Sequence, residues 1–249
     1  MNFQNDRYPW NVRALLESTA TPFTIADHGP RTAIFRQGDP CDSVMHIERG
    51  RVWLAVTAHS GKEAICGLLD TGAFLGEEAL SGCGERRQSA TAMAATQVLV
   101  VAKAHMIQLL RTQSEILDRF IAHLFARNLR LETNLTDQLL YRSEQRLTHV
   151  LLVLANCDER RPRRCALPDL SQEIIAEMVG TTRSRVNAFM GKFKKCGFIE
   201  EHSGVLHVNP ARLHAVLDGD SQDRSRRRGT GESYRDSRRA TSLAQATAA

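Results

Sequence analysis

Hydrophobic residues recur along this chain at two different spacings, and the change from one to the other divides it into regions. Between residues 23 and 101, apolar and polar residues alternate in short runs that are separated by glycine-containing turns. Such alternation is typical of β-strands, and many short strands in succession favour a β-barrel or β-roll. The predicted strands are 31–35, 44–47, 51–56, 63–69 and 97–101. From residue 114 to about residue 140, apolar side chains instead recur every three or four positions, which predicts one long helix.

Two short amphipathic helices meet at a glycine in the segment Leu170–Phe193. Gly180 ends the first helix, and the hydroxyl of Thr181 or Thr182 caps the second. The apolar positions of each helix share one face: Ile174, Ile175, Met178 and Val179 in the first, and Val186, Phe189, Met190 and Phe193 in the second. This arrangement predicts a helix-turn-helix. The alternative is an ordinary amphipathic hairpin with a solvated basic face, for which the glycine, the cap and the charge asymmetry would coincide by chance.

The exposed face of the second helix carries groups that suit the recognition of DNA. Arg183 can pair with guanine and Asn187 with adenine in the major groove. Arg185 and Lys192 suit contacts to phosphate, which position a protein without reading sequence. We therefore expect a DNA-contacting surface that consists of Thr182, Arg183, Ser184, Arg185, Asn187 and Lys192.

The long helix predicts a dimer. Its seam residues step alternately by four and three positions: Leu117, Ile121, Leu124, Asn128, Leu131, Leu135 and Gln138. Two helices with such a heptad seam pair, and Asn128 within the seam would fix their register. A helix that packs only on its own domain is the alternative. A DNA reader of this kind uses two half-sites about 34 Å apart, however, which favours a homodimer.

Five regions follow from these patterns. Residues 1–20 form an arm, 21–110 a jelly-roll-like β-roll, 111–140 the dimerisation helix, 141–217 a winged helix-turn-helix, and 218–249 a tail. The wing is a β-hairpin with predicted strands at 198–201 and 205–208. The tail is rich in arginine and has no apolar periodicity, so we expect it to be disordered. The predicted fold class is therefore α+β.

Composition and charge narrow the class of protein further. The chain has 249 residues, 42% hydrophobic and 24% charged, which is enough for two small domains with cores. Its net charge of +5 and its pI of about 9.1 suit a polyanionic partner such as double-stranded DNA. No run approaches the roughly 20 apolar residues of a membrane span, and the first residues lack the apolar core of a signal peptide. We expect a cytoplasmic protein with no membrane partner.

The sequence offers little catalytic or metal-binding chemistry. Its six cysteines are scattered without a C-x-x-C pair: Cys41, Cys66, Cys83, Cys157, Cys165 and Cys196. We expect reduced, mostly buried thiols and no metal site. No Ser, His and Asp set and no carboxylate pair occurs at a recognisable spacing, so no catalytic residue is assigned and an enzyme is not expected.

Two motifs within the predicted β-roll resemble those of a known family. The first is Gly38-Asp39-Pro40 followed by Val44, Ile47, Gly50 and Val52, and the second is Phe74-Leu75-Gly76-Glu77 followed by Arg87. Together with the helix-turn-helix they resemble the CRP/FNR superfamily of bacterial transcription regulators, over about residues 21–217. The resemblance implies a homodimer that binds a palindromic operator, contacts RNA polymerase and takes a small effector, such as cyclic AMP, in its β-roll.

The resemblance also implies an effector-binding cassette. Gly76 lets the backbone approach a ligand closely, Glu77 can accept a hydrogen bond from a ribose hydroxyl, and Arg87 can neutralise a phosphate. Arg86 is the alternative partner for the phosphate. In the family pattern a Ser or Thr follows the arginine directly, whereas here one residue separates Arg87 from Ser89.

The long helix departs from the pattern of cyclic-AMP-responsive relatives. In those relatives it supplies two adjacent hydroxyl residues to the purine, and the matching positions here hold Leu131 and Glu132. Either Asn128 and Thr133 supply the contact in a shifted register, or the ligand is not cyclic AMP. The helix-turn-helix differs from the family pattern as well. The pattern of arginine, glutamate and arginine becomes Arg183, Ser184 and Ala188, which predicts a different operator.

Three interpretations of the roll stay open at this point. In the first it binds a small effector that controls DNA binding. In the second it is empty, and the protein is an effector-independent regulator. In the third the roll is a redox or haem sensor that uses Cys41, Cys66 or His46.

Overall fold

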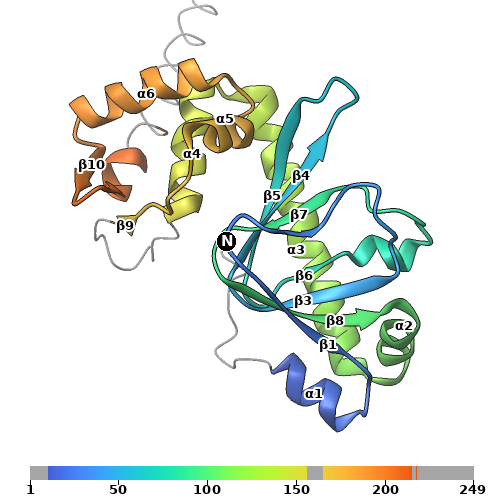
Figure 1. Ribbon diagram of the computed structural model, residues 1–249. Helices are drawn as coiled ribbons and strands as arrows, with labels where there is room; N and C mark the ends of the chain where they lie inside the picture. Colours follow the sequence, from blue (N-terminus) through green and yellow to red (C-terminus); the bar gives the residue numbers. More distant parts are fainter. Residues whose placement is uncertain (1–10, 156–164, 215–216, 218–249) are drawn as a thin grey trace, which may run out of the picture. The chain divides into compact units, whose positions relative to one another are not determined.

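The computed structural model describes residues 11–155, 165–214 and 217 (Figure 1). The chain divides into two compact units, Met1–Leu140 and Tyr141–Ala249. The predicted tail at 218–249 and the first half of the predicted arm lie outside the described residues. Within the described part of the chain, no helix is long and apolar enough to cross a membrane.

The first unit contains two four-stranded antiparallel sheets, which form the β-roll. One sheet has the order β1-β8-β3-β6, with β1 at Thr24–His28, β8 at Thr96–Ala102, β3 at Ser43–Arg49 and β6 at Phe74–Leu75. The other has the order β2-β7-β4-β5, with β2 at Ala33–Phe35, β7 at Ser89–Ala92, β4 at Arg51–Thr57 and β5 at Glu63–Asp70. Gly50 makes the tight turn between β3 and β4 with a φ of +104°, and a Cβ there would lie 2.4 Å from the Thr96 hydroxyl. Only glycine fits this turn.

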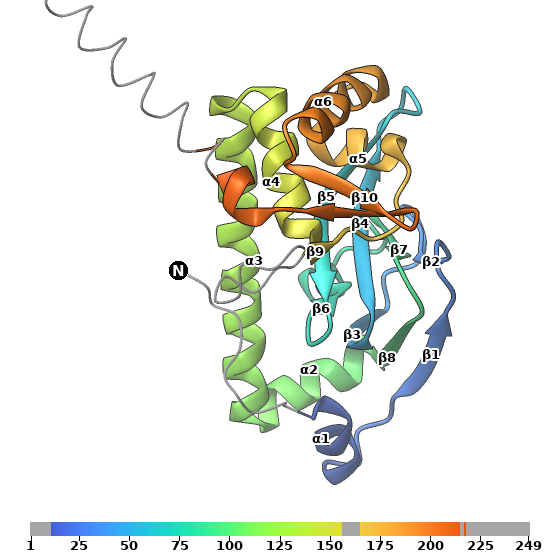
Figure 2. The same cartoon turned by 90° about the vertical axis from the view of Figure 1, so that its left-hand side faces the viewer.

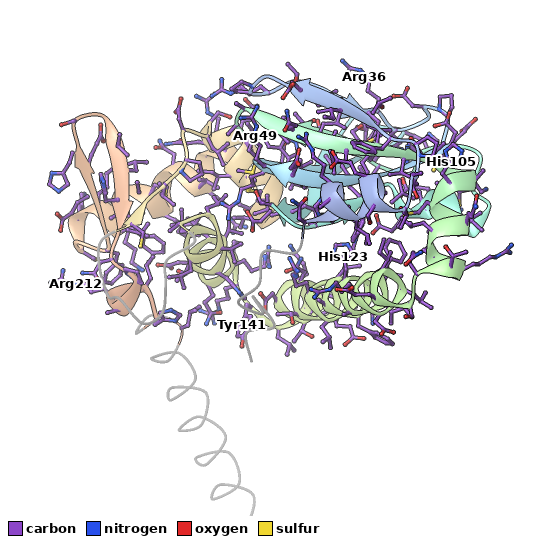
Figure 3. All side chains as sticks on the ribbon, turned by 90° about the horizontal axis from the view of Figure 1, so that it is seen from below. Arg36, Arg49, His105, His123, Tyr141 and Arg212 are labelled. Carbon is purple, nitrogen blue, oxygen red and sulfur yellow. The ribbon has the colours of Figure 1, made fainter. Side chains whose placement is uncertain are left out.

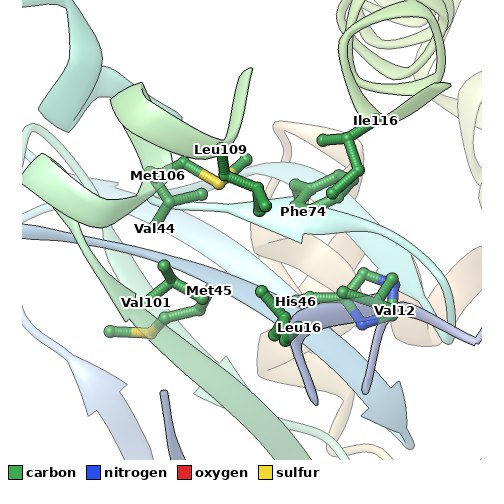
Figure 4. Close-up of a pocket in the computed structure, with 10 residues that line it drawn as sticks. All are labelled: Val12, Leu16, Val44, Met45, His46, Phe74, Val101, Met106, Leu109 and Ile116. Atoms are coloured by element: carbon green, nitrogen blue, oxygen red, sulfur yellow. The ribbon is translucent and has the colours of Figure 1, made fainter. Parts of the chain in front are cut away.

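Alternation along the strands places side chains in two separate cores. Met45 and Ile47 of β3 face the core of the roll, together with Phe35, Val52, Leu54, Leu69, Leu75, Ala90 and Val98. Val44, the residue before Met45, faces the opposite side and lies in a core that the helices cover. Figure 4 shows part of this second core around Val44 and Phe74, where a cavity of about 10 Å³ remains. Such a volume holds about one water molecule at most.

The helices of the first unit cover this second core. They are α1 (Val12–Ser18), the 3-10 helix η1 (Glu77–Ser81), α2 (Lys103–Thr112) and α3 (Ser114–Leu140). Figure 2 shows α3 running along the roll, with α2 leading into its start. Ile116 and Phe120 of α3 are buried against the roll, whereas its seam residues are exposed. The predicted long helix is confirmed over its full expected length.

The second unit is a winged helix-turn-helix. Its elements are α4 (Ser143–Ala155), β9 (Cys165–Ala166), α5 (Gln172–Val179), α6 (Arg183–Lys195), β10 (Ile199–His202) and β11 (Val205–Val208). The strands form one antiparallel sheet of order β10-β11-β9. Ser203 and Gly204 both have positive φ, at 52° and 79°, which is the geometry of a tight two-residue hairpin turn. The α+β fold with a β-roll, a long helix and a winged helix-turn-helix is therefore confirmed.

The cysteines differ in part from the prediction. Cys41, Cys66, Cys83 and Cys196 are free, as expected. Cys165 is bonded in a disulfide, so the prediction of reduced thiols is wrong for this residue. Burial is also less general than predicted, because Cys66 and Cys83 are only partly buried and Cys196 is exposed.

Candidate DNA-binding and effector sites

The turn of the helix-turn-helix is built as its residues dictate. Gly180 ends α5 in the left-handed conformation, with a φ of 69°, and its N–H donates to the Ala176 carbonyl. The Thr182 hydroxyl then accepts a hydrogen bond from the Arg185 N–H at 3.4 Å and caps α6. Val186, Met190 and Phe193 of α6 are buried. These contacts fix α6 with its N-terminal residues in solvent.

Arg146 on α4 stabilises the same turn, a role that the sequence analysis missed. Its guanidinium donates to the carbonyl of Val179 at 3.0 Å and to that of Gly180 at 3.5 Å. It also donates to the carbonyl of Tyr141 at 2.9 Å. The Val179 and Gly180 carbonyls are at the end of α5, where carbonyls have no helical partner. The Tyr141 carbonyl instead precedes α4. An arginine near the start of a helix carries no sequence signal for such a distant contact, 33 residues along the chain.

The first turns of α6 present the predicted DNA-contacting residues together. Arg183, Ser184, Arg185 and Asn187 are all exposed there. The side chain of Asn187 is close to α5, because its Oδ1 accepts from Gln172 Nε2 at 3.3 Å. The helix contains five basic residues and no acid, so its surface is strongly positive.

Lys192 lies at a different place from the other predicted contacts. It is two turns further along α6, where its ammonium pairs with Glu144 of α4 at 2.6 Å. Lys194 likewise pairs with Glu201 of β10 at 2.7 Å, which lowers the pKa of that carboxyl. The charge of Lys192 is thus paired within the unit. The other predicted contacts lie together on one exposed surface: Arg183, Ser184, Arg185 and Asn187.

The turn of the predicted effector cassette lies at Gly76, a position that only glycine can occupy. Gly76 caps η1 with a φ of 75°, and a Cβ there would lie 2.4 Å from Arg86 Nη1 and 3.1 Å from the Ser43 carbonyl. This conformation and this crowding exclude any side chain. The turn places Glu77 at the start of η1, where its side chain is largely buried.

Glu77 is paired with an arginine from the long helix. Arg127 of α3 forms an ion pair with Glu77 and donates to Gln88 Oε1 at 3.3 Å. Burial lowers the pKa of Arg127, and the charge of nearby Arg130 lowers it further. The second carboxylate oxygen of Glu77 is buried and has no hydrogen-bond partner. The site therefore holds a cation, a carboxylate with an unused acceptor and an amide.

Arg86 takes a structural position, which corrects the expectation that it offers its charge to a phosphate. Only 2% of its surface is exposed. Its guanidinium donates to the Ser43 carbonyl at 2.8 Å and to the Gly76 carbonyl at 3.1 Å, and it stacks 4.5 Å from the centre of the Phe35 ring. Because its hydrogen-bonding groups are largely used and shielded, Arg86 holds the cassette and has no charge open to a ligand.

The remaining predicted effector residues are dispersed. Arg87 is exposed, and the Ser89 hydroxyl accepts from the Gln37 N–H at 3.0 Å. Asn128 and Thr133 are exposed on α3, where Asn128 donates to Glu132 and the Thr133 hydroxyl donates to the Leu129 carbonyl. The structure thus brings together Gly76, Glu77, Gln88 and Arg127. Sequence reasoning identified Gly76 and Glu77 as site residues and missed Gln88 and Arg127.

His46, named for a haem or redox role, lies in the core beneath α3. It contacts the Phe74 ring edge-on at 5.0 Å between ring centres, and His123 of α3 contacts the same ring at 5.6 Å. Figure 3 places His123 on the side of α3 that is turned toward the roll. Desolvation lowers the pKa of each imidazole to about 4. Among the described residues, no cluster of three or more His, Cys, Asp or Glu side chains could hold a metal ion.

The fold and the exposed basic helix define a class of protein. A winged helix-turn-helix with a basic second helix is a DNA-binding module, and here it follows a β-roll and a long helix. Two family models match these two parts: one described as a cyclic nucleotide-binding domain matches residues 28–113, and one described as a Crp-like helix-turn-helix domain matches residues 145–216.

Individual relatives agree with this class. The cyclic AMP receptor protein of Thermus thermophilus is 30% identical over 182 residues, which cover 72% of this chain and 81% of that protein. A CRP-like cAMP-activated global transcriptional regulator of Mycobacterium tuberculosis is 28% identical over 184 residues, covering 72% of this chain and 82% of the relative. The structure of the c-di-GMP-responsive global regulator CLP of Xanthomonas campestris superimposes with a TM-score of 0.68 at 18% identity, covering 80% of this chain and 99% of that one.

The chain belongs to the CRP/FNR superfamily of transcription regulators. It is a DNA-binding regulator with a cyclic-nucleotide-binding-type domain.

Proposed function

We propose that the protein is a cytoplasmic homodimer that binds a palindromic operator through α6 of each subunit. The observation that carries this proposal is the exposed seam of α3. Its apolar residues Leu117, Ile121, Leu124, Leu131 and Leu135 are between 37% and 59% exposed in the single chain. A second copy of α3 would cover this stripe by coiled-coil pairing. Two subunits would then present two recognition helices to two half-sites.

The recognition helix supports sequence-specific reading by a small set of residues. Arg183 is the best candidate for a base contact, because it is exposed at the first position of α6. Arg185 suits a phosphate, and Thr182, Ser184 and Asn187 line the same end of the helix. Because Lys192 is paired with Glu144, its phosphate contact would compete with this ion pair.

We further propose that an effector with an anionic group and a hydroxyl binds between Glu77 and Arg127. The anion would replace Glu77 as the ion-pair partner of Arg127. The unused carboxylate oxygen of Glu77 would accept a hydrogen bond from the hydroxyl of the effector. A cyclic nucleotide carries both groups, a phosphate and a ribose hydroxyl. The names of relatives that are cAMP-activated support this class of ligand. Exposed Arg87 would add a second charge from the rim.

Binding would act on α3, since Arg127 is part of that helix. An effector that breaks the pair between Arg127 and Glu77 has different contacts in the two states, which is what shifts a two-state equilibrium. The change would reach the DNA-binding unit through the end of α3 and alter contacts with DNA and RNA polymerase. The relatives named as cAMP-activated global regulators support activation as the direction of control.

Isothermal titration calorimetry with cyclic AMP and cyclic GMP tests the effector proposal. We expect wild-type protein to bind one of them, and R127Q to bind at least tenfold more weakly because the anion loses its partner. R119Q is the matched control, since Arg119 lies on the same helix in an ion pair with Glu115 at 3.6 Å. Equal binding by R127Q and R119Q would contradict the role of Arg127. No heat with either nucleotide would reject cyclic-nucleotide sensing.

A second candidate function is effector-independent DNA binding. One observation favours it: the charge of Arg127 is already paired with Glu77 and its guanidinium also donates to Gln88, so no cation of this site is free for an anionic ligand. Under this alternative, R127Q would change neither the calorimetry nor the affinity for the operator.

A further inference from the structure

Two charged residues of α3 flank its exposed seam on opposite sides. In the heptad lettering abcdefg, the seam residues take positions a and d: Leu117, Ile121, Leu124, Asn128, Leu131, Leu135 and Gln138. Arg127 precedes an a residue and so falls at g, and Glu132 follows a d residue and so falls at e. Residues at e and g form the salt bridges between the helices of a coiled coil. The heptad therefore places both charges where a second helix would meet them.

The order of the two units along the chain favours a parallel pair of helices. The DNA-binding unit begins at Tyr141, directly after α3 ends at Leu140. Two half-sites on one DNA need both DNA-binding units at the same end of the helix pair, and parallel helices provide this. In a parallel pair, a g residue lies beside the e residue of the following heptad on the other helix. Arg127 of one subunit then lies beside Glu132 of the other, a contact that rests on the proposed homodimer.

Arg127 has N–H groups to spare for a second carboxylate. Its Nη1 pairs with Glu77, and its Nη2 donates to Gln88 Oε1 at 3.3 Å. A guanidinium carries five N–H donors, so these two contacts do not use all of them. The side chain is still 21% exposed. Arg127 can thus contact its own roll and a second chain at the same time.

Glu132 is an exposed carboxylate that forms no ion pair with any described residue of its own chain. Its Oε1 accepts from Asn128 Nδ2 at 3.1 Å, one turn earlier on α3. Glu132 cannot meet Arg127 of its own helix, because a separation of five residues places two side chains about 140° apart around the helix axis. An interaction between these two residues therefore has to cross from one subunit to the other.

The flank of α3 that carries Glu132 is otherwise apolar at the same heptad position. Phe125 and Leu139 share position e with Glu132, and they are 65% and 75% exposed in the single chain. The g flank instead faces the roll of its own chain, where Phe120 is buried. A parallel partner would lay its e flank beside this g flank. The apolar e residues of each subunit would then be shielded by the other subunit, which gives their exposure in the single chain a physical reason.

We propose that Glu132 of the partner subunit pairs with Arg127 and so contributes a carboxylate to the candidate effector site. Arg127 then joins Glu77 of its own roll to the long helix of the second subunit. Two carboxylates offset the cost of burying the guanidinium charge better than one. An effector anion that binds Arg127 competes with both carboxylates, so effector binding and helix pairing are linked through one cation.

The dissociation constant of the dimer tests this pair in the full-length protein without any effector. Fluorescence-detected sedimentation measures the constant for wild type, E132Q, R127Q and the double variant. Glutamine at position 132 removes the charge and keeps the oxygen that accepts from Asn128. We expect E132Q to raise the dissociation constant about threefold. E132Q should have no further effect in the R127Q background, because the same interaction cannot be lost twice.

E115Q is the matched control. Glu115 lies at position b of the same helix, away from the seam, and pairs with Arg119 of its own chain at 3.6 Å. E115Q should therefore leave the dissociation constant at the wild-type value.

A charge reversal keeps the proposal open to rejection if R127Q disturbs the roll. E132K would place an ammonium beside Arg127 of the partner subunit and should raise the dissociation constant about tenfold, an effect that salt reduces. An equal effect of E132Q in wild type and in R127Q, or a wild-type dissociation constant in E132K, would overturn the pair and leave the proposed homodimer intact. A wild-type protein that is monomeric at every measured concentration would overturn the homodimer and the pair together.

Discussion

A few residues carry most of the chemistry of this protein, and their surroundings decide what each can do. Two adjacent arginines show this best. Arg86 is enclosed by the Ser43 and Gly76 carbonyls and by Phe35, so it stabilises the cassette, whereas Arg87 is exposed. Neighbours in sequence thus differ in role because one side chain points into the core and the other into solvent.

Arg183 is expected to contribute to sequence reading and not merely to charge. R183A should lose about 1–3 kcal/mol of binding free energy for the selected operator, because a bidentate pair with guanine would be lost. Fluorescence anisotropy with the operator and with unrelated DNA measures this loss. K195A is the control of equal charge change, and it should weaken both complexes alike. If R183A lowers affinity for the two DNAs by the same factor, Arg183 does not read bases.

The buried histidines His46 and His123 predict how stability depends on pH. Their pKa values are lowered to about 4, below the 6.5 of an unfolded histidine, so the unfolded chain binds more protons between these pH values. Their contribution is fully present above pH 6.5 and is lost as the pH falls toward 4. Urea unfolding at pH 7, 5.5 and 4.5 should show this fall in the free energy of unfolding, and H123F should reduce its slope. An equal slope in H123F would contradict this origin.

At the scale of elements, helices and strands with a strong hydrophobic periodicity could be predicted from the sequence. Elements that are short or have few apolar residues could not. Five of the eight strands of the roll carry enough alternating apolar residues to be recognised, as does the whole of α3. The others lack this signal: β6 has two residues, β7 is Ser-Ala-Thr-Ala, and β1 is largely exposed. Helix α2 was also missed, because its buried Met106 and Leu109 are few and follow a strand directly.

The candidate effector site shows the same limit for contacts that are distant in sequence. Gly76 and Glu77 belong to one local motif and were predicted as site residues. Arg127 lies 50 residues beyond Glu77, on the long helix α3. The hydrophobic pattern of that helix predicts only which residues form its seam. A local pattern does not record which cation meets a buried carboxylate, since tertiary packing alone decides that pairing.

The seam of α3 predicts how dimerisation responds to substitution. L135E should shift the protein to monomers in sedimentation velocity, because a charge would lie in the apolar stripe. Leu135 is 59% exposed in the single chain, so the substitution should leave the fold of the roll unchanged. T136E is the control, because Thr136 is exposed on the same helix outside the seam. A dimer that persists in L135E but not in T136E would place the interface on another face.

At the scale of the whole molecule, the two units have separate tasks that the proposed dimer would combine. The first unit carries a polar site inside a β-roll and the seam for pairing, and the second carries the basic recognition helix. The charge of the chain does not by itself imply two half-sites. That expectation comes from the helix-turn-helix, which in DNA readers of this kind uses two half-sites, and from the exposed seam, through which two copies would pair.

The central claim is that one dimer reads two half-sites of a palindrome. The most direct measurement is the affinity of the full-length protein for a palindrome made from its selected half-sites, compared with the same half-sites separated by about five extra base pairs. That insertion rotates one half-site by about half a helical turn. We predict that it lowers affinity to the level of a single half-site. Equal affinity for both DNAs would contradict the claim.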